Sequence, residues 1–188
     1  LFLEKEGKAA STVSRALAST RSFFGWLFKE GKIRRDPADS MHAPKIEKKV
    51  PVILTVDEVT KLLEQPSGAN PKEIRDKAML ELLYATGIRV TELVNLKLSD
   101  VNMSIGFITC RDEHKERMIP FGHAAKDALA KYLESAREAF LKGTRSELLF
   151  TNYSGRAMSR QGFWKIIKYY GDRASHPTLC AILSRRTS

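Results

Sequence analysis

The spacing of apolar residues predicts a mainly helical chain. Apolar side chains recur every three or four residues from 11 to 30, from about Pro71 to 86, from 123 to 142 and from 160 to 170. Shorter helices are expected directly after Thr55 and over 90–96. Local signals mark several ends, because Ser or Thr favours a helix start and Gly favours a helix stop. These signals are caps at Ser11 or Thr12, Thr55 with Glu58, and Ser159, and stops at Gly31, Gly87 and Gly143.

Two β-rich runs interrupt the helices. Residues 105–110 (IGFITC) and 117–122 (RMIPFG) flank the charged turn RDEHKE, which predicts a β-hairpin. A short strand is also expected over 148–151. The predicted fold class is therefore mainly α with a small β-hairpin or sheet (α+β).

A change of composition divides the chain. Residues 41–52 (MHAPKIEKKVPV) contain two prolines and four charged residues, with no apolar period, as expected of a linker. We expect a first helical domain over 1–42, a linker over 43–53, a second domain over 54–174 and an irregular tail over 175–188. The chain begins without Met and inside an amphipathic pattern, so a preceding segment is expected.

Composition and charge narrow the class of protein. No apolar run approaches the ~20 residues that span a bilayer, so no membrane segment is predicted. Cys110 and Cys180 fit neither a disulfide framework nor a metal-ligand spacing, which indicates a reducing cytoplasm and no bound metal. The net charge of +10 favours a polyanionic partner, and nucleic acid is the leading candidate.

One arginine has an informative position. In residues 85–101 (ATGIRVTELVNLKLSDV), Arg89 lies between two predicted helices, where its planar guanidinium could bind two phosphate oxygens. Glu92, one turn later, could support it. The simpler alternative is that the two side chains form an ordinary surface ion pair.

The segment 84–100, YATGIRVTELVNLKLSD, resembles the first signature of the tyrosine recombinases, in particular the Xer and phage-integrase type. Four other segments resemble parts of the same family: LTVDEVTKLLEQ, HKERMIPFG, LLFTNYSGRAMSRQGFWKIIKYYG and GKAASTVSRALASTRSFFGWLFKEGKIRRDPA. The resemblance covers about 174 of the 188 residues. It implies part of a helical core DNA-binding (SAM-like) domain, followed by a truncated catalytic domain.

The resemblance also implies a reaction. A tyrosine attacks a DNA phosphate to form a 3′-phosphotyrosyl link, two arginines stabilise the charge, histidines assist proton movement and a lysine protonates the leaving oxygen. No metal and no cofactor is implied. By resemblance Arg89 is the first arginine, Glu92 supports it and Lys115 is the candidate lysine, although RDEHKER lacks the first lysine of the usual hairpin pattern. Lys115 could also be an ordinary turn residue, and Arg111 is a poor substitute because its pKa is too high.

Other residues are expected to contact double-stranded DNA. Arg160, Gln161 and Lys165 lie near the start of a predicted helix, where side chains and amides can reach the DNA backbone. Arg15 and Arg21 fall off the apolar stripe of residues 11–30, so they face either solvent or phosphate. Other recombinase protomers, as in the family's tetrameric synapse, are further expected partners.

The tail, SHPTLCAILSRRTS, departs from the family pattern. Cys180 stands where the resemblance places the second arginine. Codons for this tail, read in a shifted frame, are compatible with Thr-Pro-His-Thr-Leu-Arg-His-Ser-Phe-Ala-Ala-His-Leu, which resembles the family's next signature. The sequence thus suggests a frameshift near 173–175, and a divergent C-terminus is the alternative. In either case the second arginine, the histidines and the tyrosine are missing, so catalysis is expected to be incomplete.

Three functions therefore stay open: a site-specific recombinase by descent, a DNA-binding module that does not cleave, and a helical interaction protein with incidental charge.

Overall fold

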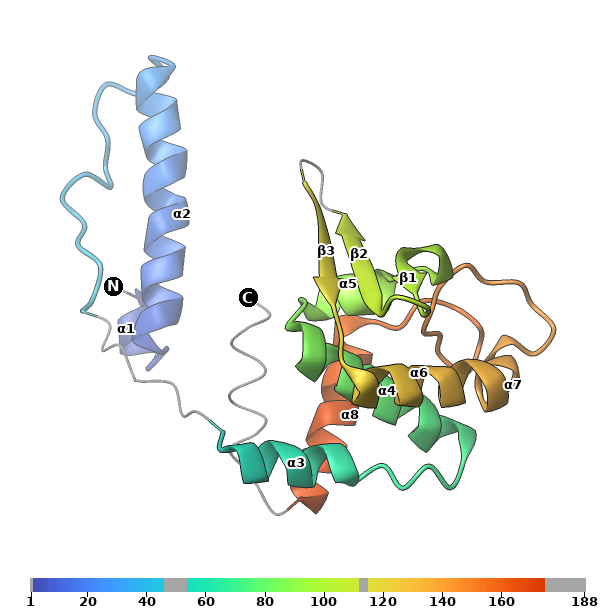
Figure 1. Cartoon of the computed structure of the whole chain (residues 1–188). Coiled ribbons are helices and arrows are strands. Elements are labelled where there is room, and N and C mark those ends of the chain that lie inside the picture. Colours follow the sequence, from blue (N-terminus) through green and yellow to red (C-terminus); the bar gives the residue numbers. More distant parts are fainter. Residues whose placement is uncertain (1, 46–53, 112–114, 175–188) are drawn as a thin grey trace. The chain divides into compact units, whose positions relative to one another are not determined.

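The computed structural model describes residues 2–45, 54–111 and 115–174. The chain divides into two compact units, residues 1–50 and 51–188. Most of the predicted linker and the whole predicted tail, 175–188, lie outside the described residues. Within them the architecture is mainly helical with one small antiparallel sheet, so the predicted fold class is confirmed (Figure 1).

The first unit is built on one long helix. The short helix α1 (Phe2–Lys5) precedes α2 (Ala10–Lys29), which buries Val13 and Leu17. The predicted cap at Ser11 or Thr12 is wrong, because both residues lie inside α2. The N-cap is Ala9, which makes no side-chain hydrogen bond. Gly31, with φ +66°, follows the end of α2, as the stop signal predicted.

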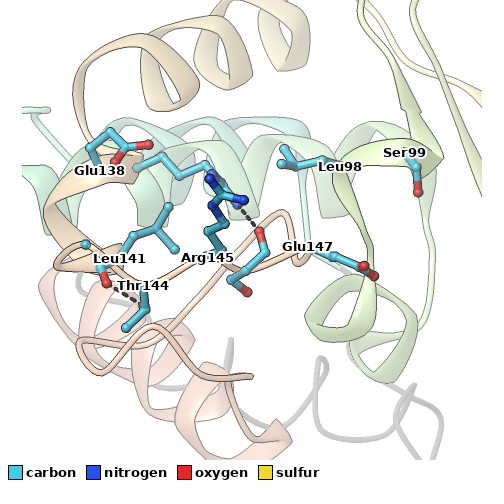
Figure 2. Close-up of a pocket in the computed structure, with 10 residues that line it drawn as sticks. Leu98, Ser99, Glu138, Leu141, Thr144, Arg145 and Glu147 are labelled. Carbon is cyan, nitrogen blue, oxygen red and sulfur yellow. Dashed lines mark hydrogen bonds between the residues drawn. The ribbon is translucent and has the colours of Figure 1, made fainter.

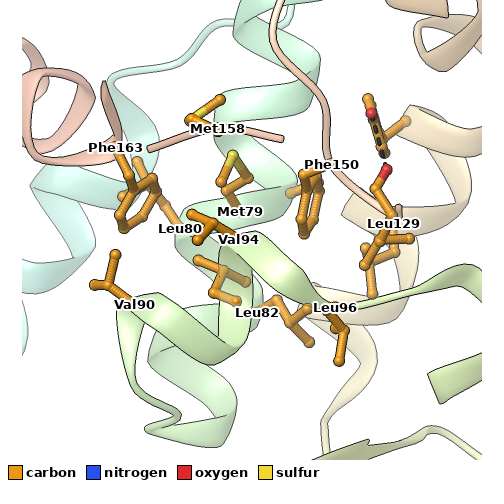
Figure 3. Packing of buried hydrophobic residues seen from close by; sticks show 14 of the residues in the cluster. Met79, Leu80, Leu82, Val90, Val94, Leu96, Leu129, Phe150, Met158 and Phe163 are labelled. Carbon is orange, nitrogen blue, oxygen red and sulfur yellow. Dashed lines mark hydrogen bonds between the residues drawn. The ribbon is translucent and has the colours of Figure 1, made fainter. Parts of the chain in front are cut away.

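The second unit is built around α4. Its helices are α3 (Val56–Glu64), α4 (Pro71–Thr86), α5 (Val90–Asn95), α6 (His123–Ser135), α7 (Arg137–Leu141) and α8 (Arg160–Arg173), with a 3₁₀ turn η1 (Leu98–Asp100). α4 packs against α3, α5, α6 and α7, and α8 packs against α5. Met79 of α4 is fully buried among side chains of α5, α8 and the segment that precedes α8 (Figure 3).

Local capping signals fix several helix ends as predicted. Thr55 and Glu58 form a reciprocal capping box at the start of α3. Ser159 accepts a hydrogen bond from the Gly162 amide, 3.0 Å away, at the start of α8. Gly87 ends α4 in the left-handed conformation, with φ +61°. Because hydrogen bonds or backbone angles fix these helix ends, the turns that join the helices begin and end at defined residues.

The sheet consists of β1 (Val101–Asn102), β2 (Phe107–Arg111) and β3 (Glu116–Pro120), all antiparallel in the order β1-β2-β3. The predicted hairpin is confirmed, and Cys110 of β2 pairs with Arg117 of β3. β1 was not predicted, because two residues are too short to produce a recognisable alternation.

Two further predictions differ from the structure. The helix expected over 123–142 is broken at Ala136, whose φ of −123° separates α6 from α7. After the break, the Arg137 side chain donates from Nη2 to the carbonyls of Ser146 and Leu148, at 2.7 and 3.0 Å. The strand expected over 148–151 is reduced to two isolated bridges, with Leu148 opposite Lys97 and Thr151 opposite Ala157.

A buried polar network ties α4 to α8. Asp76 is fully buried, and its Oδ1 accepts hydrogen bonds from Nε and Nη2 of Arg75, at 3.0 and 2.7 Å. The Tyr170 hydroxyl donates to Asp76 Oδ2 over 3.2 Å, and Lys72 Nζ lies 3.2 Å from the same oxygen. Arg75 Nη1 also donates to the Thr151 carbonyl. Because Asp76 lies on α4 and Tyr170 on α8, this buried hydrogen-bond network fixes how the two helices pack against each other.

Candidate phosphate-binding site

The turn between α4 and α5 holds Arg89 at the position expected from the sequence. Gly87 ends α4, and Arg89 is the N-cap of α5, with extended backbone angles (φ −69°, ψ 147°). The Arg89 amide donates to Glu92 Oε2 over 2.7 Å, which fixes the bend. The Arg89 side chain is 62% exposed, so its guanidinium is open to a large ligand.

Glu92 is bound more closely by a different arginine. Nη2 of Arg117 donates to both Glu92 oxygens, at 2.6 and 2.7 Å. Arg89 Nη1, by contrast, lies 3.6 Å from Glu92 Oε1. The Glu92 side chain is only 16% exposed, which strengthens its electrostatic interactions relative to those in water. Glu92 is thus shared unequally between two cations.

Arg117 is the site residue that the sequence interpretation missed. A signal was available, because side chains two residues apart share one face of a strand. This periodicity places Arg117 on the face of β3 that Lys115 would continue and that Ile119 also occupies. The hairpin therefore contains one cation, Arg117, that reaches α5, whereas the sequence interpretation places it at the start of the run 117–122 and gives it no role.

The other hairpin cations differ in their surroundings. Lys115 is exposed and lies immediately before β3 begins at Glu116. Arg111 forms ion pairs with Asp100 and with Glu116, the latter at 3.2 Å. The hydrogen bond to Asp100, followed by the charge of Glu116, raises the pKa of Arg111 further above its ordinary value. Arg111 is therefore a poor proton donor, and Lys115 is the better candidate for that role.

A basic exposed face runs along α8. Arg160, Gln161 and Lys165 are exposed on its first turns, whereas Phe163 and Ile166 point into the core. In the first unit, Arg15 and Arg21 are exposed on α2, and Arg21 Nη2 lies 3.5 Å from the Asp39 carbonyl. All five side chains have the exposure that contact with a DNA backbone requires.

A hollow of the second unit lies away from Arg89. It has a volume of about 880 Å³ and is bounded by η1, α7 and the loop over 143–147 (Figure 2). Glu138 and Glu147 lie on opposite sides of it, and Arg137 bonds to the Ser146 carbonyl at its edge. A smaller cavity of about 350 Å³ lies beside Glu92 and includes Cys110 in its lining. Arg89 lines neither of them, and its side chain is 62% exposed, so a polymer backbone could reach it.

Across residues 2–45, 54–111 and 115–174, no group of three His, Cys, Asp or Glu side chains is arranged to hold a metal ion. Within those ranges, every helix is too short or too polar to cross a bilayer.

Comparisons with known proteins identify the family. A model of the phage integrase family matches residues 53–179. Tyrosine recombinase XerD of Halalkalibacterium halodurans is 44% identical over 167 residues, which make up 88% of this chain and 56% of that protein. XerD of Listeria monocytogenes serotype 4b is 46% identical over 169 residues, covering 89% of this chain and 57% of that protein. The chain thus spans less than three fifths of the length of these relatives.

The fold also matches solved structures. The XerH site-specific recombinase, in its pre-cleavage complex with the difH substrate, superposes with a TM-score of 0.73 at 20% identity. The match covers 99% of this chain and 55% of that one. XerA recombinase superposes with a TM-score of 0.61 at 24% identity, covering 99% of this chain and 63% of the other.

Proposed function

Because the chain belongs to the phage integrase family, as the motif at residues 84–100 indicated, we propose that it binds double-stranded DNA and carries part of a site-specific recombinase active site. The observation that carries this proposal is the Arg89 guanidinium, which is exposed at a fixed bend and only loosely paired. Such a group can bind two non-bridging oxygens of a DNA phosphate and stabilise the charge that develops there.

The remaining site residues receive roles within this proposal. Glu92 holds the backbone of the bend through its bond with the Arg89 amide. Lys115, immediately before β3, is proposed to protonate the leaving 5′ oxygen. In this scheme the positioned cations replace a metal ion, so the reaction needs neither a metal nor another cofactor.

Backbone contacts come from both units in the proposal. Arg160, Gln161 and Lys165 of α8 and Arg15 and Arg21 of α2 are proposed to hold DNA phosphates. The net charge of +10 supports this, because cations that neutralise phosphates release counterions. Further recombinase protomers on the same DNA, as in a tetrameric synapse, are the proposed protein partners. The proposed location is the cytoplasm, where DNA would be accessible.

This chain is proposed to bind DNA without completing catalysis. In its sequence, Cys180 stands where the family resemblance places the second arginine, and the family match ends at residue 179. Removing members of a catalytic set that acts as a unit abolishes most of the rate. The non-cleaving DNA-binding module is thus the form in which this polypeptide would act. Sequencing the gene through codons 170–188 distinguishes a frameshift from divergence.

The test combines binding with covalent trapping. Gel shifts on a mixed-sequence duplex across a salt series should show affinity that falls steeply as salt rises. Arg89→Ala should weaken binding and reduce the salt slope by about 1, as loss of one phosphate contact predicts. The matched control is Arg145→Ala, an exposed arginine on the 143–147 loop, which should change little.

The outcomes are distinct. A nicked suicide duplex should yield no covalent protein–DNA adduct with this chain, and a trapped adduct would overturn the proposal of incomplete catalysis. Absence of salt-dependent binding would instead favour the helical interaction protein over any DNA-binding role.

A further inference from the structure

Glu92 lies between two arginines, and the closer of the two belongs to the hairpin. Arg117 contacts both carboxylate oxygens at 2.6 and 2.7 Å, whereas the Arg89 guanidinium remains 3.6 Å away. In sequence, Arg89 and Glu92 are three residues apart on one helical turn, which is the spacing of an ordinary ion pair. That they pair only loosely therefore needs a cause, and the competing contact from β3 supplies one.

We propose that Arg117 is a positioning residue that keeps Arg89 available for DNA. By binding both oxygens of Glu92, Arg117 prevents this carboxylate from drawing the Arg89 guanidinium down and neutralising it. Arg89 then keeps its charge directed outward, at 62% exposure of the side chain. This inference rests on the proposed role of Arg89 in binding phosphate and extends it to a residue on a different structural element.

The structure also explains how Arg117 is held in place. It is paired with Cys110 across the hairpin, and Cys110 is buried, so β2 anchors the strand segment from which Arg117 extends. The contact between Arg117 and Glu92 joins β3 to α5 across 25 residues of sequence. The hairpin must therefore pack against α5 before Arg117 can bind Glu92 and leave Arg89 free to bind phosphate. Lys115, two residues earlier, would arrive with the same strand.

A direct contact between Arg117 and DNA is the alternative, because this side chain is 47% exposed. The two roles differ in one respect. If Arg117 acts through Glu92, then removing the Glu92 charge should compensate for loss of Arg117. If Arg117 instead touches a phosphate, Glu92→Gln should change affinity by the same factor whether or not Arg117 is present. Glutamine retains an oxygen that can accept from the Arg89 amide, so the bend is preserved.

The experiment is a double-mutant cycle on DNA binding, using the full chain, a 40-base-pair mixed-sequence duplex and about 0.1 M salt, where charges within ~10 Å still interact. Arg117→Met should weaken binding about twofold to fivefold, equivalent to one lost ion pair at a partly exposed position. Glu92→Gln should restore most of that affinity in the Arg117→Met background, a gain larger than any change it causes in the unmodified chain. In an Arg89→Ala background, Arg117→Met should have almost no further effect.

Each outcome separates the two proposals. If Arg89→Ala weakens binding but Glu92→Gln acts equally in both backgrounds, the role of Arg117 is overturned and that of Arg89 stands. If Arg89→Ala leaves binding unchanged, both are overturned. Circular dichroism and thermal melting check that the variants fold. Should Arg117→Met unfold, Arg117→Lys replaces it in the same cycle with an intermediate loss expected, since a lysine cannot bind both oxygens as a guanidinium does.

Discussion

Replacing Asp76 with alanine should destabilise the second unit severely. The carboxylate is fully buried and binds Arg75, whose side chain is itself only 3% exposed. Its second oxygen accepts from Tyr170 on α8 and lies 3.2 Å from Lys72 Nζ. Asp76→Ala would leave the Arg75 guanidinium buried with the Thr151 carbonyl as its remaining described acceptor.

The magnitude follows from the burial of that uncompensated charge. Breaking a buried ion pair by removing one partner costs about 3–5 kcal/mol, and the unpaired Tyr170 hydroxyl adds up to about 1–3 kcal/mol if water cannot reach it. These costs overlap because both arise at one carboxylate, so we expect a loss of about 4 kcal/mol in the free energy of unfolding. Domains are typically stable by only about 5–15 kcal/mol, so the variant should be only marginally folded.

The assay is urea unfolding followed by the fluorescence of Trp164, which lies on α8 and reports on the second unit. Trp26→Phe removes the other tryptophan of the chain, which lies on α2. Asp172→Ala, at an exposed position of α8, serves as the control and should change stability little. Arg75→Met combined with Asp76→Ala should recover part of the loss, because no buried charge is then left alone. A loss no larger than that of the control, or a double variant as costly as the sum of both single variants, would refute the reasoning.

Two further predictions concern stability. Burial raises the pKa of the Tyr132 hydroxyl to about 12. The stability that this hydroxyl contributes is therefore complete below its ordinary pKa near 10 and is lost as pH rises toward 12. Urea unfolding between pH 8 and 11 should show stability falling above about pH 10, and Tyr132→Phe should reduce that slope. Gly87→Ala should cost about 1–2 kcal/mol and lower the melting temperature, because alanine resists a φ of +61° even though no atom lies within 4 Å of its Cβ. Gly122→Ala is the control and should be nearly neutral, since Gly122 is equally uncrowded and has an ordinary φ of −81°. Equal effects of the two substitutions would contradict this conformational explanation.

Features decided by a few neighbouring residues could be predicted from the sequence. The capping box of Thr55 and Glu58, the cap at Ser159 and the left-handed Gly87 depend on side chains and backbone within one turn. The hairpin followed from two β-rich runs that flank a charged turn. The break at Ala136 could not be predicted, since the apolar stripe continues through it and Arg137 binds carbonyls of a later loop.

The site divides in the same way. Arg89 and Glu92 could be located because one helical turn and a family motif contain both. Their unequal pairing could not, because the competing Arg117 comes from a strand 25 residues beyond Glu92. The buried hydrogen bond from Tyr170 to Asp76 spans 94 residues and likewise leaves no local pattern. Interactions of this kind depend on the completed tertiary fold.

The distance in sequence between Glu92 and Arg117 has a consequence for the newly made protein. As the polypeptide emerges from the ribosome, the bend at Gly87 and the neighbouring Glu92 appear well before the strand that contains Arg117. Contacts between distant residues also form more slowly than those within one helical turn. During this interval Arg117 cannot yet compete for Glu92, so Arg89 would pair with Glu92 and be less available to a phosphate until β3 docks.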